Sequence, residues 1–417
     1  MDEIKQQKVY IRSLYFLLFI GIGSGMPFIS AFLKHVLANP DGTPNNNLIM
    51  SIYIVLPFVG LIANPASAIL SDTFRLGKHI ITFNCICGAV LALIMAQTAE
   101  PWTVHWGVKV KFLLLFPLML VSTFFEQPLG TLIDAETMRF LNRHSTREKY
   151  GSFRLLGTVG WSVACIIVGW LVTVTQREAI IYYGTAVGYF ALALATVKGL
   201  HVKPVSEAIK IPWEHLRKDH MFQWFLVFIF LNGIVAMACF DYMAYFFDDI
   251  MQSYFRMGLI FGTWTIFEIP VMLYSHKLLE RLGNRWFIVT GLALNALRLY
   301  LFSRFTLETP FVWKFLAALI QGPAFAFTYN GFIDFVDRQA HEDMRATYLS
   351  LMNIARFTVA GALAGFLGML VINRWGTSML MRIGAYIFAG LVLFFLVFVR
   401  GHGPAGAGKN GSAIPDK

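Results

Sequence analysis

Charged residues are scarce in this 417-residue chain. Asp, Glu, Lys and Arg together make up 14% of it, whereas hydrophobic residues make up 57%. Its mean hydropathy of +0.61 lies well outside the composition of ordinary soluble domains. No connection between its apolar runs is long enough to hold a large soluble domain. These shortages exclude an ordinary soluble globular protein.

Motifs for ATP use and for metal binding are also missing. The pattern G-x-x-x-x-G-K-[ST], which cradles nucleotide phosphates, does not occur in the chain. The chain has four cysteines, all within apolar runs and without metal-ligand spacing, and we interpret them as packing residues. The loop histidines lack metal spacing as well. We therefore expect no metal site, no bound cofactor and no enzymatic activity.

Long apolar runs are what the sequence has in abundance. A membrane-spanning helix needs about 20 apolar residues, and runs of that kind follow one another along nearly the whole chain. The predicted spans are 12–34, 47–70, 80–98, 110–140, 152–173, 180–197, 222–247, 254–275, 286–303, 311–335, 347–372 and 378–399. The sequence thus predicts an all-α integral membrane protein with twelve transmembrane helices.

Basic residues are distributed unequally between the two sets of loops. Net charge is +10, and 22 Lys and Arg side chains fall in the termini and even-numbered loops, against 9 in the odd-numbered loops. Because basic residues accumulate in cytoplasmic loops, both termini are expected in the cytoplasm. This distribution also argues against a nucleic-acid partner, since the excess charge belongs to membrane topology.

The chain divides into two halves of six spans each. The longest connection, with five basic residues and two prolines, separates them, and Arg-Leu-Gly recurs after the second and the eighth span, at 75–77 and 281–283. Internal duplication is common in secondary transporters, whose binding sites lie between the repeats. We predict a six-helix bundle over 1–197, a cytoplasmic loop over 198–221, a second bundle over 222–400 and a disordered tail over 401–417.

Several ionisable residues lie inside predicted spans. An ionisable side chain near the bilayer centre costs at least about 2.5 kcal/mol on insertion scales, so such residues are kept where they pair or line a path. They indicate a transporter. The candidates are Asp134, Arg154, Asp241, Glu268, Arg298 and Arg356.

The second loop resembles that of the major facilitator superfamily, which has an acid, a Gly and basic residues in short spacing. Asp72, Arg75 and Lys78 occupy this loop, and we expect them to act in gating. The sequence departs from the family pattern in having Ala68 four residues before the acid, where the family has Gly. A helix cap with solvated basic side chains explains the loop equally well.

A more specific resemblance covers most of the chain. LIDAE around Asp134 and YGSFRLLGTVGW over 150–161 are similar to the junction of spans 4 and 5 in the oligosaccharide:proton symporters. FEIP over 267–270 and ALR over 296–298 are similar to the same group, and equally to nucleoside:proton symporters and phenylpropionate permeases. The resemblance implies two six-helix bundles in the major facilitator fold.

The resemblance also implies which residues bind the solute. In the sugar symporters the acid and the Arg that match Asp134 and Arg154 bind substrate hydroxyls, and the residue matching Trp161 stacks on a sugar ring. A structural pair between Asp134 and Arg154 is the alternative, as is a packed or lipid-facing Trp161. Glu136 is the alternative acid, and Glu126 is a further candidate for the cavity.

Proton coupling is expected at a carboxyl group buried in a span. Glu268 in span 8 is the first candidate, with Arg298 as the cationic partner that the resemblance implies. Asp241 and Arg356 form a second possible pair, either functional or structural, and Asp334 is a further candidate. Where the sugar symporters have a coupling His and Glu in span 10, this chain has Gln321 and Ala324, which carry no proton at neutral pH.

We therefore expect a monomeric secondary transporter that imports a small polar solute, such as an oligosaccharide or another sugar, together with a proton. A nucleoside or aromatic-acid symporter is the alternative, and an exporter or a non-transporting sensor is less favoured. The expected surroundings are membrane lipids, in the inner membrane of a bacterium, and the coupling ion is the proton. Direction and stoichiometry stay open at this level.

Overall fold

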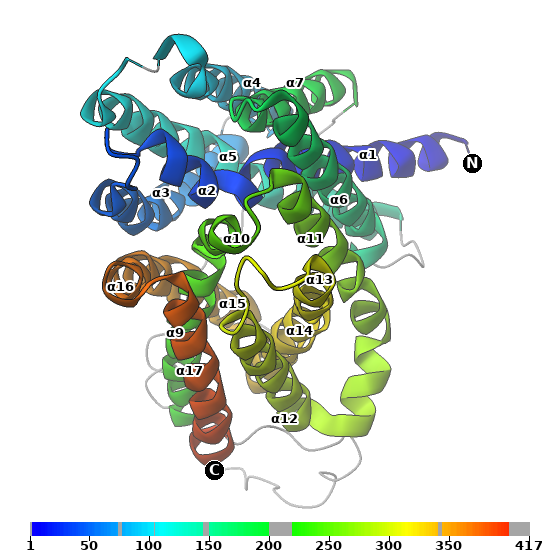
Figure 1. Ribbon diagram of the computed structural model, residues 1–417. Helices are drawn as coiled ribbons and strands as arrows, with labels where there is room; N and C mark the ends of the chain where they lie inside the picture. Colours follow the sequence, from blue (N-terminus) through cyan, green and yellow to red (C-terminus); the bar gives the residue numbers. More distant parts are fainter. Residues whose placement is uncertain are drawn as a thin grey trace, which may run out of the picture.

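The computed structural model describes residues 2–73, 77–103, 105–144, 150–199, 219–340 and 344–399. These residues are almost wholly helical, and an isolated bridge between Ala38 and Pro44 is the extended pairing found among them. Apolar residues surround most helices on all sides, as expected for helices that face both lipid and protein. Figure 1 shows the amino-terminal helices gathered on one side of the molecule and the carboxy-terminal helices on the other.

The described residues of the amino-terminal half contain seven α-helices, which make six crossings. The first crossing is α1 followed by the short η1 and α2, and Pro27 lies at this interruption, where a missing N–H breaks the helical ladder. The bounds of the helices are α1 Asp2–Gly25, η1 Met26–Phe28, α2 Ile29–Val36, α3 Asn46–Thr73, α4 Gly77–Ala96, α5 Val108–His144, α6 Tyr150–Thr175 and α7 Ile180–Gly199.

The carboxy-terminal half also makes six crossings, several of them from two helices in succession. Its helices are α9 His220–Asp241, α10 Met243–Met251, α11 Tyr254–Ile266, α12 Glu268–Phe302, α13 Phe311–Leu319, α14 Gln321–Gln339, α15 Arg345–Asn353, the π-helical segment η5 Ile354–Val359, α16 Ala360–Trp375 and α17 Thr377–Phe398.

The predicted number of spans agrees with the structure. Eleven helical segments are long and apolar enough to cross a membrane, and one of them, Tyr254–Phe302, is 49 residues long. This segment reverses direction at Gly283, whose φ of 73° suits a residue without Cβ. It therefore supplies two crossings, which meet at the lower right of the molecule in Figure 1. The described residues thus make twelve crossings.

Small residues let the two halves approach closely. A Cβ on Gly169 of α6 would clash with the Tyr254 carbonyl of α11, and a Cβ on Gly365 of α16 would lie 2.7 Å from the Tyr53 carbonyl carbon of α3. Close approach through small residues is the usual way in which membrane helices associate. The closest approaches between the halves are consequently those of α6 with α11 and of α3 with α16.

Aromatic residues fill the carboxy-terminal half. Phe225 of α9 stacks on Phe335 of α14 with ring centroids 4.1 Å apart, and Phe228 lies edge-on to Phe332 at 5.8 Å. All four side chains are fully buried. This packing holds α9 against α14.

The predicted bundles over 1–197 and 222–400 stay predictions; α7 ends at Gly199 and α9 begins at His220. The predicted central loop over 198–221 lies mostly outside the described residues, which resume at Asp219. The predicted tail over 401–417 lies wholly outside them.

Candidate functional site

Four crossings of the carboxy-terminal half are interrupted. α9 ends at Asp241, and α12 begins at Glu268 after a break at Phe267. α14 begins at Gln321 after a break at Ile320, and Arg356 lies in the π-helical η5. Interrupted helices and π-bulges are enriched at functional sites, because they free backbone groups and re-aim side chains. Here each interruption carries a polar or charged side chain.

These side chains line one cavity of about 680 Å³ between the two halves. The amino-terminal half contributes a small part of the wall, with Met26 from η1 and Arg154, Leu155 and Thr158 from α6. The carboxy-terminal half contributes the rest, and its polar lining residues are Asn232, Asp241, Glu268, Asn295, Arg298, Gln321, Thr328, Tyr329, Asn330 and Arg356. The volume suits a small-molecule site.

The predicted pair of Glu268 with Arg298 is not formed in this conformation. Both residues line the cavity, but within the described part of the chain no ion pair or hydrogen bond joins them. The charged group that acts electrostatically on Glu268 is Arg154, which lies on α6 in the other half. The two halves are therefore linked across the cavity by opposite charges.

The predicted pair of Asp241 with Arg356 is likewise absent. Both side chains line the cavity, and neither forms an ion pair or a hydrogen bond within the described residues. The reason is their placement on separate interruptions, one at the end of α9 and the other inside η5. A pair between these two residues, whether functional or structural, does not describe this conformation.

Arg298 and Arg356 are buried arginines with unused donors. Arg298 is 5% exposed, and its Nη2 donates to Asn295 Oδ1 at a long 3.4 Å. Arg356 is 4% exposed and lies 5.1–5.6 Å from three ring centroids, those of Tyr329, Phe332 and Phe357. Nε of both arginines and Nη1 of Arg356 are buried without a hydrogen-bond partner.

Asp134 lies outside the cavity wall, whereas Arg154 lines it. Asp134 on α5 accepts a hydrogen bond from the Tyr15 hydroxyl of α1 at 2.7 Å. The same hydroxyl lies 3.0 Å from Thr137 Oγ1. Asp134 therefore connects α5 to α1 in this conformation, and its role toward a solute remains a prediction.

Trp161 is placed differently from the expectation that it faces the cavity. Its side chain is 8% exposed and does not line the cavity. Its Nε1 donates to the Phe261 carbonyl of α11 at 2.9 Å, and the neighbouring Ser162 hydroxyl donates to the Gly262 carbonyl at 2.7 Å. In this conformation Trp161 joins the two halves.

The remaining acidic candidates also lie away from the cavity wall. Glu126 is held inside the amino-terminal half by the hydroxyls of Ser122 and Tyr189. Glu136 accepts from Arg139 Nη1 at 2.7 Å. Asp334 accepts from Arg338 at 2.8 Å and from Asn284 at 2.9 Å, which makes it an anchor of α14 and not a lining residue.

The predicted gating residues Asp72, Arg75 and Lys78 lie outside the residues whose side chains are described. Of the recurring Arg-Leu-Gly, the second copy ends at Gly283, where the chain turns between two crossings. The Arg-Leu-Gly motif at 281–283 therefore coincides with a turn in the structure.

The sequence reasoning missed the amides of the cavity. Asn232, Asn295 and Asn330 line it, together with Gln321, which had been considered only as a residue unable to carry a proton. Asn and Gln in an apolar run are a weaker sequence signal than charges, but several in neighbouring spans would have pointed here.

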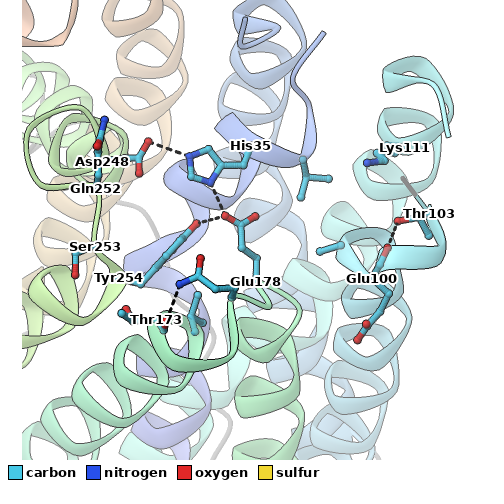
Figure 2. A pocket seen from close by; sticks show the side chains of 14 residues that line it. His35, Glu100, Thr103, Lys111, Thr173, Glu178, Asp248, Gln252, Ser253 and Tyr254 are labelled. Atoms are coloured by element: carbon cyan, nitrogen blue, oxygen red, sulfur yellow. Dashed lines mark hydrogen bonds and ion pairs between the residues drawn. The ribbon is translucent and has the colours of Figure 1, made fainter. Parts of the chain in front are cut away.

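It also missed a charged cluster at the end of the molecule opposite the termini. Lys34 of α2 pairs with Asp248 and Asp249 of α10, with N–O distances of 2.6 Å to each. Figure 2 shows His35 between Asp248 and Glu178, while the Tyr254 hydroxyl donates to Glu178 at 2.8 Å. A second cavity, of about 550 Å³, is lined by His35, Glu178, Asp248 and Tyr254 of this cluster.

The contacts of this cluster join the two halves and close the molecule at this end. Two further hydrogen bonds do the same: Asn46 to Asn373 at 2.7 Å and Tyr245 to Asn46 at 3.1 Å. Burial of Asp248 by itself would raise the pKa of its carboxyl, but the hydrogen bonds from His35 and Lys34 outweigh it and leave that pKa lowered. Asp248 is therefore held as a charged partner.

The chain matches the MFS_1-like family over residues 9–393, which is nearly its whole length. The chain belongs to the MFS_1-like family. The predicted major facilitator fold and family resemblance are thereby confirmed, and the chain is an integral membrane protein.

Similar proteins agree with membership of the MFS_1-like family. An uncharacterized transporter, YwbF of Bacillus subtilis strain 168, is 24% identical over 360 residues, covering 84% of this chain and 82% of YwbF. A maltose permease of Geobacillus stearothermophilus is 22% identical over 416 residues, covering 97% of each protein. The crystal structure of the nucleoside transporter NupG superposes with a TM-score of 0.77 at 18% identity, covering 94% of this chain and 99% of NupG. The structural similarity to NupG shows that the two proteins share a fold.

Proposed function

We propose that this MFS_1-like protein is a proton-coupled symporter that imports a small polar solute by alternating access. The observation that carries the proposal is the cavity between the two halves, in which Asp241 and Glu268 face Arg154, Arg298 and Arg356 at interruptions of the helices. Ionisable groups at such positions mark solute and proton paths. We expect no enzymatic activity from this chain.

Sugars and nucleosides are the first solute classes to test. A relative is named a maltose permease, and a protein of similar structure is a nucleoside transporter. The amides of Asn232, Asn295 and Asn330 suit hydroxyl and carbonyl groups of either class, because each amide both donates and accepts. The aromatic-acid alternative is retained with them.

The conformation fits one state of an alternating-access cycle. The end opposite the termini is closed by Lys34 with Asp248 and Asp249. The cavity on the other side of this contact is accessible, since its lining residues Met26 and Leu273 are 49% and 65% exposed. If the termini lie in the cytoplasm, as the basic loops predict, this is the inward-facing state.

Glu268 is assigned the coupling role. It lies on the carboxy-terminal half, and Arg154 acts on it from the amino-terminal half. Protonation of Glu268 removes one charge of this pair, which changes the attraction between the two halves. Proton binding and the movement of the halves are coupled in this way, and Arg298 and Arg356 keep the cavity positive while the solute enters.

We further propose that the protein works as a monomer in a bacterial inner membrane, with both termini in the cytoplasm. The proton is the coupling ion, and no resident cofactor takes part. Each half provides one wall of the cavity, so a single chain contains the complete site.

A pH measurement tests the coupling. In de-energised cells expressing the protein, addition of a transported solute should make a lightly buffered medium alkaline, and Glu268→Gln should abolish this response while solute exchange persists. Glu280→Gln is the matched control, because Glu280 lies on the same helix, is exposed and pairs with His276 at 3.3 Å. Uphill uptake that survives in Glu268→Gln would contradict the assignment of Glu268.

A further inference from the structure

The cavity has more positive than negative side chains. Its lining contains the guanidinium groups of Arg154, Arg298 and Arg356 and the carboxylates of Asp241 and Glu268. Protonation of one carboxylate during symport would increase this excess. A cavity with an excess of charge of one sign and with apolar walls attracts ions of the opposite sign. The wall is thus electrostatically suited to an anion.

Arg356 is the most unusual of these charges. Its side chain is 4% exposed and lines the cavity, and Nε and Nη1 are buried without any hydrogen-bond partner. The aromatic rings of Tyr329, Phe332 and Phe357 surround it and offset part of its desolvation. No carboxylate within the described residues neutralises it, although two carboxylates line the same cavity.

The backbone holds Arg356 in this position. η5 is a π-helical segment, and its Arg356 carbonyl and Cα lie against Gly233 of α9, where a Cβ would clash. The adjoining residue Asn232 lines the cavity and is 2% exposed. Close packing of η5 on α9 therefore fixes the backbone position from which the Arg356 side chain reaches the cavity.

Arg298 adds a second buried positive charge. It is 5% exposed, its Nε has no partner, and its hydrogen bond to Asn295 is long at 3.4 Å. The side chain lies 5.5 Å from the ring centroid of Phe302. Buried charges are normally paired, so two incompletely satisfied guanidinium groups in one cavity indicate a binding partner from outside the chain.

We propose that the solute is a small organic anion and that Arg356 binds its carboxylate or phosphate group. The inference rests on the proposed function as a symporter and specifies the class of its solute. Guanidinium groups bind carboxylate and phosphate oxygens with paired, charge-assisted hydrogen bonds. Arg298 adds positive potential, and the amides bind the hydroxyl or carbonyl groups on the rest of the solute. A monoanion that enters with one proton moves no net charge.

Pairs of probes that share a skeleton and differ in charge test this inference. Binding to the purified full-length protein in detergent is measured for galacturonate and galactose, for benzoate and benzamide, and for glucose 6-phosphate and glucose. We expect the anion of at least one pair to bind at least about tenfold more tightly than its neutral counterpart. The pair that responds distinguishes a carboxylate from a phosphate ester.

Two variants tie the preference to Arg356. Arg356→Gln should weaken binding of the anion about tenfold or more and leave the neutral probe unchanged. Arg374→Gln is the control, because Arg374 lies at the end of α16, beside Trp375 and outside the cavity. Equal or tighter binding of the neutral probes, or anion binding unaffected by Arg356→Gln, would overturn the inference.

The melting temperature of the protein without solute tests the inference if no probe binds. If Arg356 is kept for a ligand, Arg356→Met should raise the melting temperature of the empty protein, since it removes a buried charge without a partner. If the melting temperature of Arg356→Met falls and none of the probes binds, the inference is overturned.

Proton movement separates this inference from the proposed function. Neutral solutes carried with protons would refute the anion and preserve the symporter. Anion binding without proton movement would preserve the anion and refute the symporter.

Discussion

Lys34 Nζ lies 2.6 Å from carboxylate oxygens of both Asp248 and Asp249, and this contact joins the first crossing of one half to the first crossing of the other. Lys34 also lies 4.7 Å from the ring centroid of Tyr245, which borders the same contact. The side chains of Lys34 and Asp248 are 14% and 11% exposed. Such a partly buried ion pair is worth more than a solvated one.

Removal of this contact should open the closed end of the molecule. Lys34→Gln loses charge-assisted hydrogen bonds worth about 1.5–3 kcal/mol, so the population open at this end should rise about tenfold or more. The measurement is the labelling rate, from that side, of a cysteine placed at Met237 in the cavity of a variant without native cysteines. Lys109→Gln is the control, because Lys109 is exposed at the start of α5. An unchanged rate would show that other contacts keep this end closed.

Crowding between α3 and α16 should have a similar effect. In Gly365→Val the new side chain would lie against Tyr53, where even a Cβ would be 2.7 Å from the carbonyl carbon, so the two helices must separate. We expect faster labelling of the cysteine at Met237 from the closed end. Gly390→Val is the matched control, since nothing lies within 4 Å of a Cβ added there. Equal labelling in both variants would contradict the prediction.

Trp161 should matter for stability and little for solute affinity. Trp161→Phe removes the hydrogen bond to the Phe261 carbonyl and leaves that buried oxygen with fewer donors, at a cost of about 1–3 kcal/mol. The melting temperature should fall, and the KM for transport should stay within about twofold. A large rise in KM with little change in melting temperature would instead place Trp161 at the solute, as its sequence context suggested.

The ion pair of Glu100 with Arg177 should make the stability of the amino-terminal half depend on pH. Burial by itself would raise the pKa of Glu100, but hydrogen bonds from Arg177 at 2.6 Å and Tyr183 at 2.7 Å outweigh it and lower that pKa. A lowered folded-state pKa stabilises the fold above the ordinary value of about 4.3, and this stabilisation is lost as the pH falls below it.

The melting temperature should consequently decline below about pH 4.3, and Glu100→Gln should reduce the slope. The effect is modest, since the side chain of Arg177 is 53% exposed and solvent screens the pair. Glu308→Gln, which removes an exposed carboxylate, serves as the control. The same slope in Glu100→Gln as in the unchanged protein would contradict the assignment.

The sequence by itself determined the class of the fold and much of the cavity. Membrane spans can be recognised in a sequence because each needs about 20 apolar residues. Each span must also form its backbone hydrogen bonds internally, which requires a helix. Charges inside spans are costly, so the rare ones pointed to function. Arg154, Asp241, Glu268, Arg298 and Arg356 were selected on this ground, and all five line the cavity.

Only the tertiary structure decided how these charges are arranged. Pairing depends on helix rotation and on interruptions such as Phe267 and η5, which follow from packing between helices and leave little trace in hydropathy. Glu268 and Asp241 therefore face the cavity without the partners expected from sequence, and Trp161 meets the Phe261 carbonyl. The closing cluster of Lys34 with Asp248 likewise joins residues 214 positions apart, a contact that only the packing of the two halves creates.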